Sequence, residues 1–187
     1  GRHALRSDIV YYAARCFWNT ATGFMTTAAT RSTIAEPLET ILDACRATKV
    51  NDFRFMQSMF LLLFDCLEDK SSWAEGARQI EAAFSFLPDT EHQPLWEYKV
   101  LFMTVMGESV IDELSKITKY DEEMQAKVWA TVAAQAKDPV DALKAHKKAI
   151  HVLDNQPWIK VDFMIDFAEW IDASGQSASD AEDVLLS

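Results

Sequence analysis

Residues 125–158 constrain the fold more than any other stretch of the chain. Apolar side chains recur there at spacings of three and four residues, which places them on one face of a helix. Asp138 and Pro139 interrupt the pattern, because aspartate accepts hydrogen bonds from the free amides of a helix start and proline fits the first helical position. The stretch therefore predicts two helices packed back to back. The facing stripes are Trp129, Val132, Ala133 and Ala136 on the first helix and Ala142, Ala145, Ala149 and Val152 on the second.

The alanines of these stripes let two helix axes approach closely. The stretch has the order of a degenerate tetratricopeptide pattern. A bulky residue is followed by small residues on the first helix, alanines line the second helix, and Pro157 closes the unit. The order returns 35 residues later at Met164, Phe167, Ala168 and Ile171. Each unit of such an array contacts only its neighbours. We therefore expect an all-α, antiparallel helix-pair solenoid, tetratricopeptide-like, with about nine to ten helices.

The chain has only five glycines and five prolines, too few for an all-β fold or for a flexible linker. We expect one helical-repeat array over residues 1–187. The sequence begins without a methionine and ends inside an apolar pattern, so we interpret it as a piece of a longer protein.

Helices are also expected before and after the central pair. Their approximate ranges are 8–23, 33–49, 51–68, 72–87, 90–106, 109–117 and 157–174, with a last helix starting at Ser177. The predicted buried stripe of the first helix is Ile9, Tyr12, Ala13, Cys16 and Phe17. Asn51 is expected to cap the helix predicted over 51–68. Thr33, Ser72 and Thr90 each precede Glu or Gln by three residues, which predicts capping boxes.

The charge distribution excludes several classes of partner. The net charge is −11, with residues 1–60 at +2 and residues 61–187 at −13. An acidic surface disfavours nucleic acid, and the apolar run at 55–64 is far shorter than the roughly 20 residues of a membrane span. We therefore expect no nucleic-acid partner and no membrane partner. The arginine-rich first 31 residues also fit a mitochondrial transit peptide, but we interpret them as an ordinary amphipathic helix.

Residues with potential chemistry lack the spacing that chemistry requires. His146 and His151 are five residues apart and lie on different faces of a helix, which excludes a shared metal ion. The sequence contains neither a nucleophile motif nor a phosphate-binding loop. The cysteines at positions 16, 45 and 66 form no paired motif and are expected to be reduced thiols. We expect no catalytic residues, no cofactor, no metal and no small-molecule substrate.

Two surface features are candidates for binding a protein partner. Lys144, Lys147, Lys148 and Lys160 form a small basic patch that suits an acidic surface, although ordinary solvated lysines are the simpler interpretation, because blocks this short are common. Trp158 is a candidate anchor, since an exposed tryptophan can fill a partner's pocket. Asp162, Asp166 and Glu169 share one helix face. That face suits a cation or a basic partner, but we interpret it as a solvated outer face opposite Phe163 and Phe167.

From about Trp73 onward, the chain resembles the large helical-repeat cilia- and flagella-associated proteins of the axonemal central-pair apparatus. The resemblance is carried by AKVWATVA at 126–133, ALKAHKKAIHVL at 142–153 and WIKVDFMIDFAEWI at 158–171. It implies a structural role in motile cilia, with the chain in the cytoplasm and in the axoneme of the cilium or flagellum. The implied partners are other central-pair proteins, including proteins next to the microtubules. It implies no catalytic residue.

We therefore interpret the chain as a scaffold and protein-interaction module of the central-pair apparatus. One alternative is a cytosolic tetratricopeptide-like adaptor whose groove binds a peptide or a partner helix. Exposed Asn, Lys or Arg side chains in a groove would favour it. Another alternative is an all-α enzyme or its regulatory subunit, which would require a closed polar pocket with perturbed acids or bases.

Overall fold

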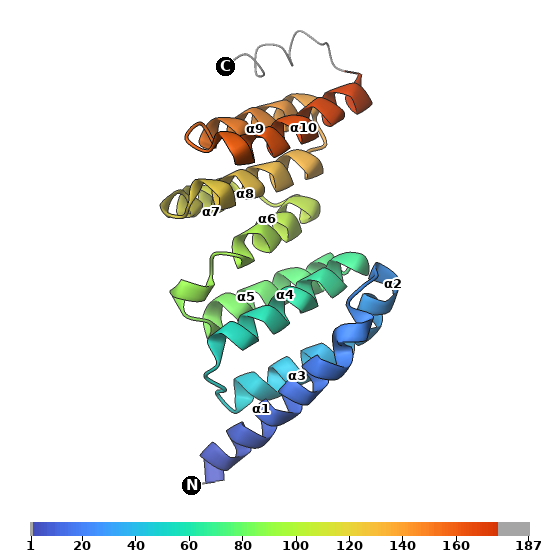
Figure 1. Ribbon diagram of the computed structural model, residues 1–187, viewed down its shortest axis with the longest axis vertical. Coiled ribbons are helices and arrows are strands. Elements are labelled where there is room, and N and C mark those ends of the chain that lie inside the picture. The colour runs from blue at the N-terminus through green and yellow to red at the C-terminus, as the bar shows by residue number, and fades with distance from the viewer. Residues whose placement is uncertain (1, 176–187) are drawn as a thin grey trace. The chain divides into compact units, whose positions relative to one another are not determined.

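The computed structural model describes residues 2–175, and within this range the chain forms helices joined by short connections and no strand (Figure 1). The expectation of an all-α helix-pair fold is confirmed. The helices are α1 (Arg2–Ala21), α2 (Ala28–Arg31), α3 (Ala35–Ala47), α4 (Phe53–Asp69), α5 (Trp73–Phe86), α6 (Leu95–Met106), α7 (Ile111–Lys116), α8 (Glu122–Gln135), α9 (Pro139–Val152) and α10 (Pro157–Ser174). The helix expected from Ser177 lies outside the described residues.

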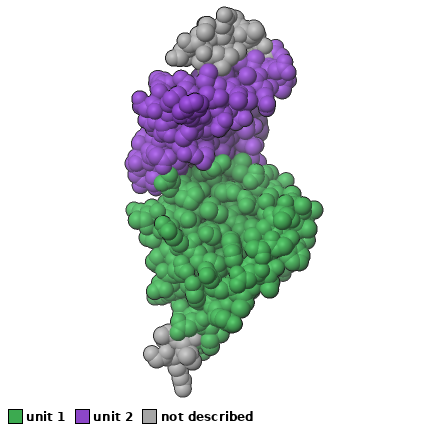
Figure 2. Space-filling model, viewed as in Figure 1, with its two compact units in different colours: residues 1–102 green, residues 103–187 purple. Residues whose placement is uncertain are grey.

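The chain divides into two compact units, residues 1–102 and residues 103–187, which are coloured separately in Figure 2. We call them unit 1 and unit 2. The expectation of one array over the whole chain stays a prediction, and each unit is described by itself.

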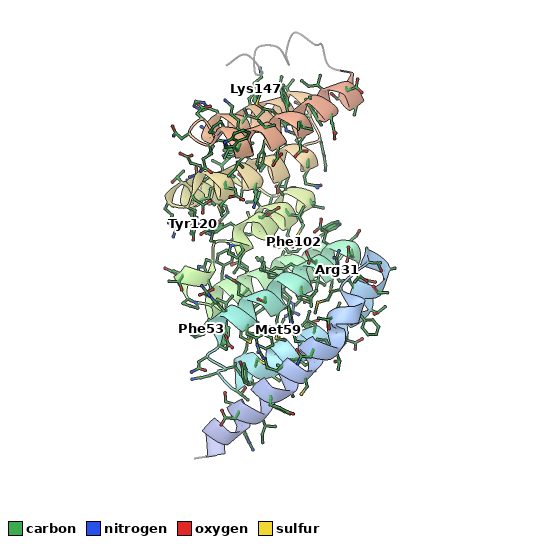
Figure 3. All side chains as sticks on the ribbon, viewed as in Figure 1. Arg31, Phe53, Met59, Phe102, Tyr120 and Lys147 are labelled. Atoms are coloured by element: carbon green, nitrogen blue, oxygen red, sulfur yellow. The ribbon has the colours of Figure 1, made fainter. Side chains whose placement is uncertain are left out.

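Unit 1 is built around α4, as its nearly all-round apolar sequence predicts. Phe60 and Phe64 of α4 are fully buried, and α3 and α5 pack against this helix. Two polar contacts fix the helices that surround it. Arg31 donates from Nε to Asp69 at 2.6 Å and from a terminal nitrogen at 2.9 Å, which ties α2 to α4 (Figure 3). Gln79 of α5 donates to Glu39 of α3 at 2.6 Å.

The predicted inner face of α1 is wrong except at Phe17. Ile9 is 62% exposed and Tyr12 is 72% exposed, whereas the side chains that pack into unit 1 are Val10, Tyr11, Ala14, Phe17, Trp18 and Ala21. The helix carries apolar residues on two faces, so spacing alone cannot choose between them. The tertiary partner decides: Tyr11 donates to Asp52 at 2.7 Å, and Trp18 makes an edge contact with Phe55.

The predicted helix starts are only partly correct. A 3₁₀ turn occupies Ser32–Ile34, so α3 starts after Thr33 and lacks the predicted capping box. A second 3₁₀ turn at Asp89–Glu91 displaces the start expected at Thr90. Ser72 does stand at the N-cap of α5, but its side chain makes no capping bond. Asp52, rather than Asn51, caps α4 through the amide of Phe55 at 3.1 Å.

Unit 2 contains the predicted central pair, α8 and α9, which pack along each other. Asp138 caps α9 by accepting from the amide of Val140 at 2.9 Å, and Pro139 occupies the first turn, as predicted. The two helices meet through small side chains, because Ala126 and Ala149 are both buried in one cluster with Trp129 packed against it. α10 then packs on α9 through Phe167 and Ile171, which contact Ile150.

Candidate protein-interaction surface

The three predicted lysines of α9 lie on the helix face opposite its buried alanines. Lys144 and Lys148 are exposed and Lys147 is half-buried; Figure 3 labels Lys147 on α9. Lys144 forms an ion pair with Asp141 at 3.1 Å, which is one helical turn away. Such a pair on an exposed helix contributes little to stability. Lys144 and Lys148 therefore remain exposed to solvent, and the charge of Lys144 is partly compensated.

Trp158 and Lys160, the two predicted contact residues of α10, differ in their surroundings. The side chain of Trp158 is 88% exposed, which is unusual for so large an apolar group. Lys160 is largely covered and donates to Asp154 at 2.9 Å, and this hydrogen bond lowers the pKa of Asp154. Among the described residues, no hydrogen bond, ion pair or ring contact joins either side chain to the three α9 lysines.

The exposed face of α10 carries more apolar residues than the sequence pattern suggested. Val161 is 47% exposed and Ile165 is 51% exposed, and both share the outer face with Trp158. Asp162, Asp166 and Glu169 are exposed beside them, as predicted, and Asp172 extends the row. Sequence reasoning identified the acidic residues but missed the apolar stripe, because Val161 and Ile165 read equally well as part of a wide buried face.

His146 lies in the interior of unit 2, between α9 and α10. Its ring centroid is 5.3 Å from that of Phe167 and 5.0 Å from that of Trp170. Burial lowers the pKa of His146, and the nearby carboxylate of Asp166 opposes this shift. Its Nε2 has no hydrogen-bond partner among the described residues. The histidine therefore acts as an aromatic packing group, while His151 is on the opposite, exposed side of α9, as its spacing predicts.

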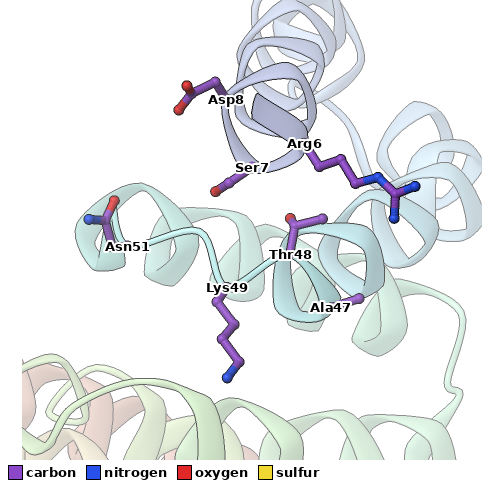
Figure 4. A pocket seen from close by; sticks show the side chains of 7 residues that line it. All are labelled: Arg6, Ser7, Asp8, Ala47, Thr48, Lys49 and Asn51. Atoms are coloured by element: carbon purple, nitrogen blue, oxygen red, sulfur yellow. The ribbon is translucent and has the colours of Figure 1, made fainter. Parts of the chain in front are cut away.

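Unit 1 contains a hollow of about 820 Å³ between the beginning of α1 and the connection from α3 to α4 (Figure 4). Arg6 and Lys49 contribute positive charge to its lining, and Asp8 contributes one negative charge. The hydroxyl of Thr48 also faces the hollow but already donates to the carbonyl oxygen of Ala44 at 2.8 Å. Sequence reasoning missed this hollow, because a helix start and a distant turn form it together.

The cysteines have the character of structural thiols. Burial raises the pKa of both Cys45 and Cys66 to about 11, so their thiolate forms are scarce at neutral pH. Cys66 also donates to the carbonyl oxygen of Arg31 at 3.2 Å. All three cysteines are free thiols, and Cys16 is the exposed one.

Within residues 2–175, no three His, Cys, Asp or Glu side chains lie close enough together to hold a metal ion. Over the same range, no helix has the length and apolar character that crossing a membrane requires.

Antiparallel helix pairs that pack through alanines and aromatic side chains, with whole helix faces left exposed, define an all-α helical-repeat protein. No family model matches the chain. It is 27% identical over 182 residues to cilia- and flagella-associated protein 46 from Chlamydomonas reinhardtii. The alignment covers 97% of this chain but only 6% of that relative. The resemblance carried by residues 126–171 is therefore confirmed in part: the chain is distantly similar to a cilia- and flagella-associated protein.

Proposed function

We propose that this chain is a structural, protein-binding segment of motile cilia and flagella, located in the central-pair apparatus of the axoneme. The observation that carries the proposal is the similarity to a cilia- and flagella-associated protein over 97% of the chain. The fold suits this role, because helix pairs present long exposed faces on which neighbouring proteins can dock. Its partners would be other central-pair proteins, including proteins next to the microtubules.

The proposed role is non-catalytic. The buried cysteines and His146 support this view, because each is enclosed by packed side chains and not placed in a reactive pocket. Cys45 and Cys66 are buried thiols with a raised pKa, which disfavours the nucleophilic form. His146 is enclosed by aromatic rings and stays neutral at physiological pH, since burial lowers its pKa.

The proposal is tested by affinity capture from detergent-extracted axonemes, with mass spectrometry of the retained proteins. We expect the chain to retain central-pair proteins. If the α9 patch contributes, the Lys144→Glu, Lys147→Glu, Lys148→Glu variant retains less of them. The matched control reverses Lys119, Lys127 and Lys137, three exposed lysines of the same unit, and should capture as well as the unchanged chain. Capture that contains no axonemal protein would refute the proposal.

A second candidate function, a cytosolic adaptor that binds a peptide, is favoured by the hollow of unit 1. Arg6, Lys49 and Asn51 line this hollow and are the residue types that hold a peptide carboxylate or its backbone. The same capture from a whole-cell lysate, in which soluble cytosolic proteins are also present, separates the two functions. Retention of soluble cytosolic proteins that is lost in an Arg6→Glu, Lys49→Glu variant would support the adaptor.

A further inference from the structure

The outer face of α10 combines a row of apolar side chains with four carboxylates. Trp158, Val161 and Ile165 follow one another at spacings of three and four residues, so they form a single stripe along the helix. We call them the α10 outer stripe. The opposite side of the helix, with Phe167 and Ile171, is buried against α9. The stripe is therefore additional to the surface that holds α10 in unit 2.

Four carboxylates accompany the stripe: Asp162, Asp166, Glu169 and Asp172. All four are exposed, and none of them forms a hydrogen bond or an ion pair with another described residue. The one basic residue of α10, Lys160, is largely covered and is already paired with Asp154. Like charges at spacings of three and four residues repel one another on a helix. An external source of positive charge would relieve this repulsion.

We propose that the α10 outer stripe is the docking site for a basic amphipathic helix of a partner protein. This inference rests on the proposed interaction role and gives that role a surface and a class of partner. The stripe spans about 10 Å of helix axis, which corresponds to two turns of a facing helix. A partner with apolar residues at positions i, i+3 or i+4 and i+7, and with Lys or Arg on both flanks, complements its shape and its charge.

The same surface disfavours other classes of partner. A peptide strand requires the open edge of a sheet, and α10 offers none because its backbone bonds are used within the helix. Anionic lipid and nucleic acid are repelled by the four carboxylates. Only a cationic partner with an apolar stripe satisfies both features of the face.

A titration with model peptides tests this inference on the intact chain. The probe is a fluorescein-labelled, helix-forming peptide of about 18 residues with a leucine stripe and lysine on both flanks. One control peptide has glutamate in place of every lysine, and another has the same composition in scrambled order. We expect saturable binding of the lysine peptide by fluorescence anisotropy, weakened by added salt, and at least about tenfold weaker binding of both controls.

Two variants locate the binding site. Val161→Ser with Ile165→Ser should weaken binding by about tenfold or more, because it removes the stripe. The matched control is Val140→Ser with Ile111→Ser, which changes the same two residue types at exposed positions of the same unit and should bind normally. Asp162→Lys with Asp166→Lys should reverse the preference in favour of the glutamate peptide. Circular dichroism verifies that each variant keeps its helices.

Several results would overturn the inference. They are the absence of saturable binding, equal binding of the lysine and glutamate peptides, or an equal effect of the two serine variants. Concentration-dependent dimerisation that the Val161→Ser, Ile165→Ser variant abolishes would place a second copy on the stripe and would also overturn it. If the chain captures axonemal proteins but binds no lysine peptide, this inference fails and the proposed function stands. If it binds the peptide but captures no axonemal protein, the proposed function fails instead.

Discussion

Gly76 is the residue at which a single added carbon would have the clearest effect. A Cβ atom there would lie 2.5 Å from Cε1 of Phe102, whose side chain is fully buried. Phe102 has little room to move, because its ring contacts those of Phe64, Trp73 and Tyr98. Glycine therefore allows α5 and α6 to approach closely within unit 1.

Overpacking usually costs about 1–3 kcal/mol, and alanine gains roughly 1 kcal/mol over glycine inside a helix. We therefore expect Gly76→Ala to lower the free energy of unfolding by up to about 2 kcal/mol. Urea denaturation measures the difference. The control is Gly23→Ala, where nothing lies within 4 Å of the added carbon. If Phe102→Leu fails to rescue Gly76→Ala, the proposed clash is not the cause.

His146 should make the stability of unit 2 depend on pH. Burial holds its pKa below the 6.5 of an unfolded chain, so the unfolded state takes up a proton first as the pH falls. Stability from this group is complete above pH 6.5 and is lost as the pH falls toward the lower, folded pKa. The effect is limited to about 1.4 kcal/mol per pH unit.

We expect His146→Phe to flatten the pH dependence of unfolding below about pH 6.5, since phenylalanine fills the aromatic cluster without a titratable group. It should also raise stability at neutral pH by about 1 kcal/mol, because it removes a buried nitrogen without a partner. His151→Phe, at an exposed position, serves as the control. An unchanged slope in His146→Phe would contradict the buried, neutral assignment.

At the scale of the helix, a residue in the left-handed conformation follows α10, at Gly175, and three earlier helices of the described chain, and the three earlier ends are alike. Lys49 after α3 has φ 55°, Ser71 after α4 has φ 51° and Gly107 after α6 has φ 79°. Each end has the paired hydrogen bonds of a Schellman cap; after α3 these are Lys49 to Arg46 at 3.1 Å and Val50 to Cys45 at 3.0 Å. Two of the three positions therefore carry a residue that disfavours this conformation.

Lys49→Gly should stabilise the chain by about 1 kcal/mol, because glycine adopts positive φ without the clash of a Cβ atom. Gly107→Ala should destabilise it by a similar amount for the converse reason. Thermal unfolding of the two variants, compared with the unchanged chain, measures both effects. A loss of stability in Lys49→Gly would mean that contacts of the lysine side chain outweigh the strain in its backbone.

The helices show how far the sequence can predict this fold. The α8 and α9 pair was predictable, because Asp138, Pro139 and the alanine stripe combine capping, backbone and packing signals at one place. The inner face of α1 was not, because apolar residues cover two of its faces and the choice depends on Phe55 and Asp52, far along the chain. Thr33 and Thr90 failed as caps because 3₁₀ turns shifted the helix starts.

The candidate surface was likewise predictable where local spacing decides, and not predictable where tertiary packing decides. Spacing alone placed Asp162, Asp166 and Glu169 on an exposed face of α10. Val161 and Ile165 are exposed because α9 packs on the opposite face of α10, and no local pattern shows which of the two apolar faces of α10 will be covered. The hollow of unit 1 joins residues about 40 positions apart, so only the tertiary structure reveals it.

On the scale of the whole molecule, the two units bury different kinds of side chain. Unit 1 fully buries Phe60, Phe64 and Phe102 together with large aliphatic residues, whereas many buried positions of unit 2 are alanines. Alanine removes much less apolar area from water. We therefore expect unit 2 to open more readily than unit 1.

Hydrogen–deuterium exchange checks this expectation. Amides of α4 should exchange more slowly than amides of α8 and α9, with opening free energies that differ by about 2 kcal/mol or more. Equal protection of the three helices would show that both units unfold together, in contradiction to the expectation.

The most direct test of the proposed axonemal role is rebinding to axonemes. Fluorescently labelled chain is added to demembranated Chlamydomonas axonemes, either complete or from cells that lack cilia- and flagella-associated protein 46, and the amount that sediments with them is measured. If the chain occupies the place of the related segment, it should bind saturably to the deficient axonemes and weakly to complete ones, where that place is filled. Equal retention on both, or retention on neither, would contradict a role in this structure.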